Sequence, residues 1–299
     1  MHLHRAQRAE ESLNQFLLLE TESPQSKPEH VAEALLQLQY LLGLELRFEE
    51  RKRVLGSLIQ LGVVDREGVL NYCFPTLHRW NGSLAAAALE NFWREDPQDP
   101  RLRVALGRYR TGQGRVDDAL SILEPCRREF PNSVSTAAAL MACLHEQAAW
   151  KEIGDILTSL PAANSNQPWL LSRMRGHFHN QQEEFAEAAK CFQMVIDANP
   201  ADAECWMGLG TAQAGQNDTT KHQLCLKTSL KLSRIQNRIG WAIDQPDDVS
   251  ALQEIAEIAE GIGLAKEASL VVQCALKEQP QHQELLALRE RLQSKVDQQ

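Results

Sequence analysis

The chain has 299 residues, of which 43% are hydrophobic and 24% are charged, a balance typical of folded rather than disordered proteins. Its 31 Lys and Arg residues against 40 Asp and Glu residues give a net charge of −9. This charge disfavours nucleic acid as a partner, because phosphate backbones repel an acidic surface. Aromatic residues make up only 6% of the chain, which favours a helical fold over an all-β one.

No apolar run reaches the length of about 18 residues that a membrane span needs. The first residues, Met1 to Glu11, are charged and lack the apolar core of a signal peptide. We therefore expect a cytoplasmic protein with no membrane partner, while a longer natural N-terminus with a signal or anchor is an open alternative. The seven cysteines include no C-x-x-C pair, so we expect neither a disulfide framework nor a metal site, and no cofactor is suggested.

The N-terminal part of the chain has helical patterns without a repeat signature. Leu3 to Leu19 is amphipathic at the helical period, and Glu29 to Leu61 is amphipathic with a break near Gly43. The stretch 21–28, which contains Ser and Pro residues, joins the two. We interpret residues 1–65 as a helical N-terminal segment.

Four similar segments each end in a proline, and the prolines define a repeat: Pro97, Pro131, Pro200 and Pro280. The first interval is 34 residues, a period typical of helix–turn–helix repeats, and the second is 69 residues, about two such units. The third interval exceeds two units by about a dozen residues, which we assign to an irregular insertion at Asn237 to Asp248. Residues 66–99 are expected to form a degenerate first repeat, because Pro75 interrupts its opening helix.

Small residues recur at two fixed positions of the units, where two antiparallel helices would cross closely. The pairs are Gly107 with Ala119, Gly176 with Ala188, and Ala256 with Ala268. Two units depart from this pattern, with Ile153 or His222 at the second position. In the unit that contains His222, we expect the second helix to be displaced or shifted in register.

This pattern, with Trp206, Leu209 and Gly210 as part of a W-x-x-L-G opening, resembles the tetratricopeptide repeat. The resemblance implies an all-α fold, a right-handed α-solenoid of helix–turn–helix repeats over residues 100–282. A capping helix is expected over residues 283–299, because the end of a solenoid needs a polar outer face. In this family the first helix of each unit lines a concave groove that binds peptides or proteins.

The groove positions of the family, carried onto this chain, select six candidate partner-binding residues: Arg101, Arg108, Arg173, His177, Asn180 and Glu257. The resemblance thus implies a non-catalytic protein–protein interaction scaffold, with a groove that is cationic in its middle and suited to an extended acidic peptide. The family's carboxylate clamp for chaperone C-termini is not matched, since Val104 and Ala138 stand at positions where it needs Lys and Asn.

The main alternative function is a regulatory or docking arm of a larger enzyme or assembly complex. No H-E-x-x-H, G-x-S-x-G or phosphate-loop motif occurs, and residues 1–65 are too short for a usual catalytic domain. A DNA-binding module there has little support, because its basic cluster shares a helix with Glu49 and Glu50 and is typical of a solvated face. That cluster is Arg47, Arg51, Lys52 and Arg53. The partner's identity and the oligomeric state are left open by the sequence.

Overall fold

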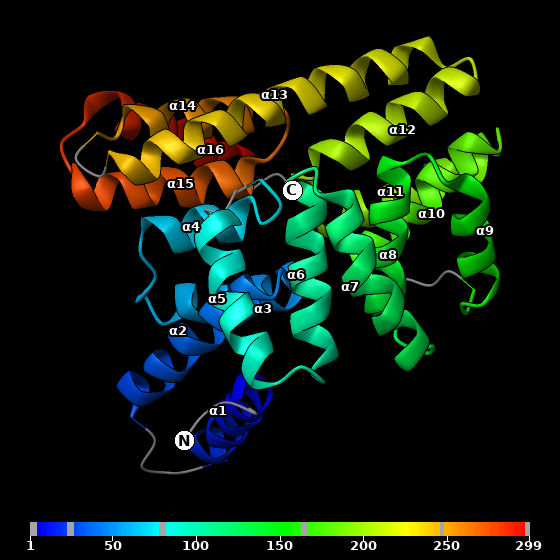
Figure 1. Cartoon of the computed structure of the whole chain (residues 1–299). Helices are drawn as coiled ribbons and strands as arrows, with labels where there is room; N and C mark the ends of the chain where they lie inside the picture. The colour runs from blue at the N-terminus through cyan, green and yellow to red at the C-terminus, as the bar shows by residue number, and fades with distance from the viewer. Residues whose placement is uncertain (1–4, 23–26, 78–81, 163–166, 246–247, 297–299) are drawn as a thin grey trace. The chain divides into compact units, whose positions relative to one another are not determined.

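The computed structural model describes residues 5–22, 27–77, 82–162, 167–245 and 248–296 (Figure 1). Within these residues every regular element is an α-helix, and there are sixteen of them, which confirms the prediction of an all-α solenoid fold. The chain divides into two compact units. Unit 1 comprises Met1–Leu61 and Trp80–Cys191, and unit 2 comprises Gly62–Arg79 and Phe192–Gln299.

The helices of unit 1 are α1 (Arg5–Glu22), α2 (Pro28–Leu44), α3 (Phe48–Gln60), α5 (Gly82–Glu95), α6 (Pro100–Gly112), α7 (Val116–Glu129), α8 (Val134–Glu146), α9 (Trp150–Thr158) and α10 (Trp169–Gln181). Those of unit 2 are α4 (Arg66–Cys73), α12 (Ala203–Gly215), α13 (Thr219–Asp244), α14 (Ser250–Glu260), α15 (Ala265–Glu278) and α16 (Gln283–Val296). The helix α11 (Phe185–Ala198) begins in unit 1 and ends in unit 2.

The repeat prolines end helices where the sequence predicts. Each of the four lies two residues beyond the last residue of a second helix: Pro97 after α5, Pro131 after α7, Pro200 after α11 and Pro280 after α15. The next helix then begins at a capped residue in several units. Asp99 accepts a hydrogen bond from the amide of Arg101 at the start of α6, for example. Such caps satisfy amide groups that have no partner within the helix.

The hairpin turns of the repeats share one backbone geometry. In four of them the residue two positions after the first helix is in the left-handed region, namely Gly114 (φ 73°), Ala148 (φ 53°), Glu183 (φ 60°) and Asn217 (φ 62°). Only one of the four is glycine, although this conformation is costly for other residues. Asparagine also adopts this conformation readily, so it is at Ala148 and Glu183 that the packing of the two helices holds the turn in a conformation that the residue itself does not favour.

The N-terminal hairpin α2–α3 has this same turn. Leu46 lies two residues after α2 with a φ of 55°. Its amide donates to the carbonyl of Gly43, and the amide of Arg47 donates to the carbonyl of Leu42. The turn between α6 and α7 has the same pair of hydrogen bonds around Gly114. Residues 28–60 therefore form a repeat-like hairpin in the segment that lacks a repeat signature.

Polar side chains explain why that hairpin escapes recognition in the sequence. Counted from the turn, Gln39 and Arg51 occupy the two crossing positions where other units have glycine or alanine. The Arg51 side chain is buried, and its Nε and Nη2 donate to Oε1 of Gln39 at 3.1 and 3.0 Å. A hydrogen-bonded pair thus replaces the small residues of the usual crossing.

At the other crossings the predicted small residues are buried. Ala119 and Ala188 are both fully buried, and Gly107 faces the side chain of Leu123. The prediction for His222 is wrong: its helix keeps the register of the other hairpins, and the ring Nδ1 lies 2.8 Å from the carbonyl oxygen of Gly210. The imidazole is accommodated at this crossing because it forms a hydrogen bond with the backbone of Gly210, which occupies the crossing position on the opposite helix.

The predicted insertion at Asn237 to Asp248 is largely helical, which corrects that expectation. Residues 237–244 form the last turns of the long helix α13 (Figure 1). The buried residues Ile235 and Ile239 of this helix belong to the core that α14 and α15 share. The C-terminal end of α13 is closed by Arg66 of α4, which donates to the carbonyls of Ala242 (2.7 Å) and Gln245 (3.1 Å). The long helix thus ends at a cap supplied by a distant part of the chain.

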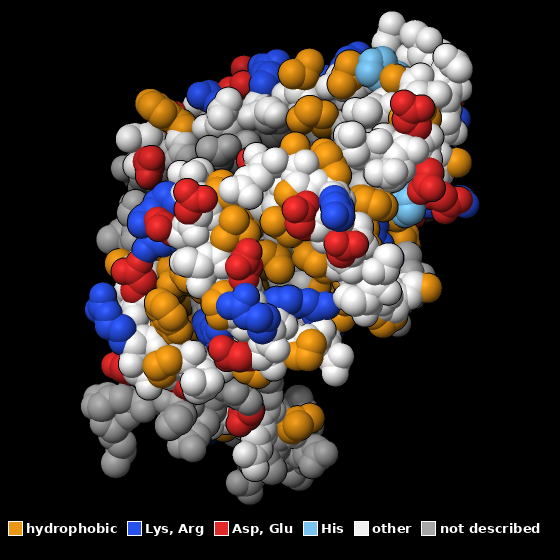
Figure 2. Space-filling model, turned by 45° about the vertical axis from the view of Figure 1, so that its right-hand side comes forward, with side chains coloured by type: hydrophobic (Ala, Val, Ile, Leu, Met, Phe, Trp, Pro, Cys, Tyr) orange, Lys and Arg blue, Asp and Glu red, His pale blue; other side chains and the backbone are white. Residues whose placement is uncertain are grey.

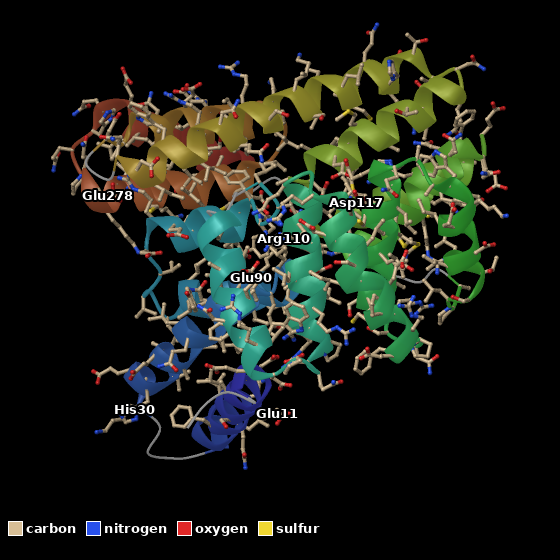
Figure 3. The ribbon with its side chains drawn as sticks, viewed as in Figure 1. Glu11, His30, Glu90, Arg110, Asp117 and Glu278 are labelled. Atoms are coloured by element: carbon tan, nitrogen blue, oxygen red, sulfur yellow. The ribbon has the colours of Figure 1, made fainter. Side chains whose placement is uncertain are left out.

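The two helices expected to form the degenerate repeat 66–99 fall in different units. α4 belongs to unit 2, where it packs on α13 and α15, and Arg66 forms an ion pair with Glu278 of α15. α5 belongs to unit 1 and packs on α6, where Glu90 forms an ion pair with Arg110 (Figure 3). The assignment of residues 66–99 to one degenerate repeat stays a prediction.

Candidate protein-interaction surface

Five of the six candidate residues lie on first helices of repeats in unit 1. Arg101 and Arg108 are on α6, and Arg173, His177 and Asn180 are on α10. Within each helix their spacing places them on one face, since residues three, four or seven apart are neighbours along a helix. We call this face of α6 and α10 the first-helix surface. Glu257 lies on α14 in unit 2 and is described separately.

Arg101 contacts two carboxylates, one of them on the N-terminal helix α1. Its Nη1 lies 2.7 Å from Oε2 of Glu10, and its Nη2 lies 3.1 Å from Oδ2 of Asp99. The Glu10 carboxylate also accepts hydrogen bonds from Arg47, whose Nη1 and Nη2 lie 2.6 and 2.9 Å from the two Glu10 oxygens. One half-buried carboxylate therefore lies between two guanidinium groups, an arrangement of strong charge-assisted hydrogen bonds.

Arg108 contacts the turn between α2 and α3. Its Nη1 donates to the carbonyl of Leu46 at 2.7 Å, and its guanidinium carbon lies 5.6 Å from the centre of the Phe48 ring. Burial lowers the pKa of Arg108 to about 10, so the side chain is still charged at neutral pH. Arg108 is thus engaged with the chain's own backbone and with an aromatic ring.

The start of α10 is also in contact with the N-terminal segment. Oε1 of Glu49, at the start of α3, accepts a hydrogen bond of 2.6 Å from the amide of Trp169, the first residue of α10. A carboxylate at this place is favourable because the first amides of a helix lack internal partners and face a positive dipole end. Further along α10, the ring of His177 lies against that of His145 of α8, with 4.6 Å between centroids.

The N-terminal segment therefore contacts the first-helix surface at three points, through Glu10, Leu46 and Glu49. Our interpretation of the basic cluster on α3 as a solvated face is wrong for Arg47 and Arg51, which are partly and fully buried. These contacts could not be predicted from local sequence patterns, because Glu10 and Arg101 are 91 residues apart. The face of the molecule shown in Figure 2 has Lys and Arg side chains beside Asp and Glu and beside hydrophobic patches.

In unit 2, the first helix α14 is covered in part by α16. Glu257 is exposed and accepts a hydrogen bond from Nε2 of Gln253 at 3.0 Å, and the same nitrogen lies 2.9 Å from Oε2 of Glu284 on α16. Glu260 forms ion pairs with Arg291 (2.7 Å) and Lys295 (2.8 Å). The hydrogen bond from Arg291, supported by Lys295, lowers the pKa of Glu260 to about 2.

Within the described residues we find no group of three or more His, Cys, Asp or Glu side chains that could hold a metal ion. The seven cysteines are all buried and none is in a disulfide. For most of them, including Cys126 and Cys191, burial raises the pKa of the thiol, so they are not thiolates at neutral pH. Among the helices that the structure describes, none is long and apolar enough to cross a membrane.

Several solved structures are similar to the chain at low sequence identity. YrrB, described as a TPR protein with an unusual peptide-binding site, is 15% identical, and the match covers 69% of this chain and 99% of YrrB with a TM-score of 0.37. PilW, a type IV pilus biogenesis factor, is 14% identical over 70% of this chain and 90% of its own, with a TM-score of 0.41. A tetratricopeptide repeat protein from Parabacteroides merdae is 12% identical over 76% and 98%, with a TM-score of 0.38.

Two family profiles described as tetratricopeptide repeat match the sequence, one over residues 82–168 and one over residues 174–221. No curated protein matches the chain in sequence. The first match covers α5 to α9, and the second runs from within α10 to the start of α13. The tetratricopeptide fold generally mediates protein–protein interaction. The chain therefore contains tetratricopeptide repeats, over residues 82–168 and 174–221.

Proposed function

We propose that the chain is a non-catalytic protein–protein interaction scaffold that binds a segment of a partner protein on the first-helix surface of unit 1. Arg101, Arg108, Arg173, His177 and Asn180 are the candidate binding residues on this surface, and Glu257 is a candidate on α14 of unit 2. The proposal includes a cytoplasmic location, for which seven free buried thiols are chemically suited.

The contact of the first-helix surface with the chain's own N-terminal segment supports this proposal most directly. Arg101 binds a carboxylate, Arg108 binds a backbone carbonyl, and the amide of Trp169 binds a second carboxylate. These are the groups that a peptide ligand offers: side-chain carboxylates and main-chain oxygens. The surface thus has the chemistry to hold a polypeptide segment, with a preference for acidic ones.

Affinity capture with the full chain tests the proposal. We expect partner proteins that the wild-type chain retains to be lost with Arg173→Glu, which reverses the charge on the first-helix surface. Lys190→Glu is the matched control, since Lys190 is an exposed residue of α11 outside this surface. Capture by the wild type should weaken as the ionic strength rises from about 0.05 to about 0.5 M, because exposed charge pairs are screened over a shorter distance.

Circular dichroism of the three proteins controls for folding in this experiment. If Arg173→Glu retains the same proteins as the wild type and the Lys190→Glu control, the first-helix surface is not the binding surface. Loss of capture with both variants would also contradict the proposal, since it would point to net charge rather than to this surface.

A further inference from the structure

The helix α1 contacts the rest of unit 1 through an ionic site at Glu10 and through an apolar contact with α2. The ionic site is the Glu10 carboxylate, which accepts hydrogen bonds of 2.6 and 2.9 Å from Arg47 and of 2.7 Å from Arg101. The Glu10 side chain retains only 14% of its exposure. Both guanidinium groups thus bind one carboxylate of α1, and each hydrogen bond between them is charge-assisted.

The two arginines are held in place by residues outside α1. Arg47 also binds Glu50, with Nε–Oε1 and Nη2–Oε2 distances of 2.7 and 2.6 Å, and Glu45 at 2.9 Å. Arg101 is held by Asp99, which also caps α6. The pair of guanidinium groups is therefore organised as a receptor for a carboxylate independently of α1, which lowers the entropy cost of binding one.

The apolar contact between α1 and α2 leaves space. A cavity of about 610 Å³ lies between the two helices, and the residues that line it are Ala9, Ser12 and Leu13 of α1 and Glu33, Leu36, Gln37, Tyr40 and Leu41 of α2. Leu36 and Tyr40 remain 43% and 50% exposed even though α1 lies against this face. The small side chains of Ala9 and Ser12 leave the apolar face of α2 incompletely covered, so α1 is an imperfect occupant of it.

We propose that the exposed face of α2, together with Arg47 and Arg101, is a docking site for an acidic amphipathic helix of a partner protein, and that α1 is a built-in competitor that this helix displaces. The partner helix presents a carboxylate to the two arginines and, one turn further, an apolar side chain to the cavity that α1 leaves. The spacing is that of Glu10 and Leu13 in α1, which places both on one helix face.

This proposal deepens the proposed function and rests on it, because it specifies the kind of segment that unit 1 binds and how access is regulated. α1 is joined to α2 by only a few residues, so it competes at a high effective concentration. A partner helix in solution therefore binds weakly until the attachment of α1 is loosened. Loss of the Glu10 charge removes charge-assisted hydrogen bonds and is expected to shift the equilibrium at least about tenfold toward the open site.

A labelled peptide of residues 5–22, added to the full-length protein, is the probe for the site. We expect fluorescence anisotropy to give at least about tenfold tighter binding to Glu10→Gln than to the wild type. Glu11→Gln is the matched control, because it removes the same charge at the adjacent, exposed position of α1 and should bind the peptide like the wild type (Figure 3). A peptide with glutamine in place of Glu10 should bind Glu10→Gln protein at least about tenfold more weakly.

Each of the other outcomes overturns the proposal. If Glu10→Gln binds the peptide no tighter than Glu11→Gln, α1 is not a displaceable competitor. If the glutamine peptide binds as well as the original, Arg47 and Arg101 are not the carboxylate receptor. If Glu10→Gln forms a dimer by exchange of α1 in size-exclusion chromatography, the occupant is a second copy rather than a partner. None of these results involves Arg173, so a failure here is distinguishable from failure of the proposed function.

Discussion

Replacing Gly107 by alanine tests the close crossing of α6 and α7. A Cβ at this position would lie 2.5 Å from Cγ and 2.6 Å from Cδ2 of Leu123, whereas carbon atoms in ordinary contact are about 3.5–4.0 Å apart. Leu123 is fully buried in the core of unit 1, and protein cores are closely packed. The added methyl group therefore forces Leu123 from its rotamer or separates the two helices.

Two opposing effects set the change in the free energy of unfolding that Gly107→Ala causes. Overpacking of a filled core costs about 1–3 kcal/mol, while alanine in place of glycine stabilises a helix by about 1 kcal/mol. The required displacement of Leu123 is about 1 Å, judged from the usual contact distance, which places the cost near the upper end of that range. We expect Gly107→Ala to destabilise the protein by about 2 kcal/mol net, equivalent to about 4–8 °C in Tm.

Gly112→Ala is the matched control on the same helix. A Cβ at Gly112 meets nothing within 4 Å, so only helix propensity acts and stability should rise by up to about 1 kcal/mol. Thermal and urea unfolding of the three proteins by far-UV circular dichroism, compared by their midpoints, measures the difference. If Gly107→Ala is as stable as Gly112→Ala, the close crossing of α6 and α7 is refuted.

Three further predictions address packing, pH and the first-helix surface. Ala188→Leu should lower the free energy of unfolding by about 1–3 kcal/mol, because Ala188 is fully buried. Ala186→Leu, on the exposed side of α11, should lower it by less than about 0.5 kcal/mol. Equal losses in urea unfolding would contradict the register of α11. Glu260 has a lowered pKa of about 2 in the folded protein, so its ion pairs stabilise above the unfolded pKa of 4.5 and are lost as the pH falls toward 2. The Tm difference between wild type and Glu260→Gln should therefore be present at pH 7 and vanish near pH 2, and a constant difference would refute this. Arg108→Glu should destabilise by about 2 kcal/mol or more, because it leaves the carbonyl of Leu46 without its donor; a wild-type Tm for this variant would show that the contact is unimportant.

The sequence by itself determined the helical repeat architecture, because the signals for it are local. Apolar residues at the helical period specify the buried face of each helix, and Pro131 and Pro280 each follow the last residue of a helix by two positions. Small residues at crossing positions, such as Gly107 and Ala119, specify how closely two neighbouring helices approach. All of these act within about one repeat length of 34 residues, so they can be identified without knowledge of the chain path.

The tertiary structure decided what departs from the repeat pattern. The pairing of Gln39 with Arg51 and the hydrogen bond of His222 to Gly210 fill crossings with polar groups, and a repeat pattern based on residue size does not contain such pairs. The extension of α13 is decided in the same way, by burial of Ile239 in the core of unit 2. Each depends on a specific partner, which a consensus of small residues does not specify.

The candidate surface was predictable only as a set of positions. The sequence placed Arg101 and Arg108 on the first helices, but it could not determine that Glu10 and the Leu46 carbonyl bind them. A charged side chain has the same local pattern whether it faces water or a carboxylate 91 residues away, because the partner is set by the path of the chain. Local sequence signals therefore determine the helices and where they end, while the contacts between distant segments determine which charges are available to a partner.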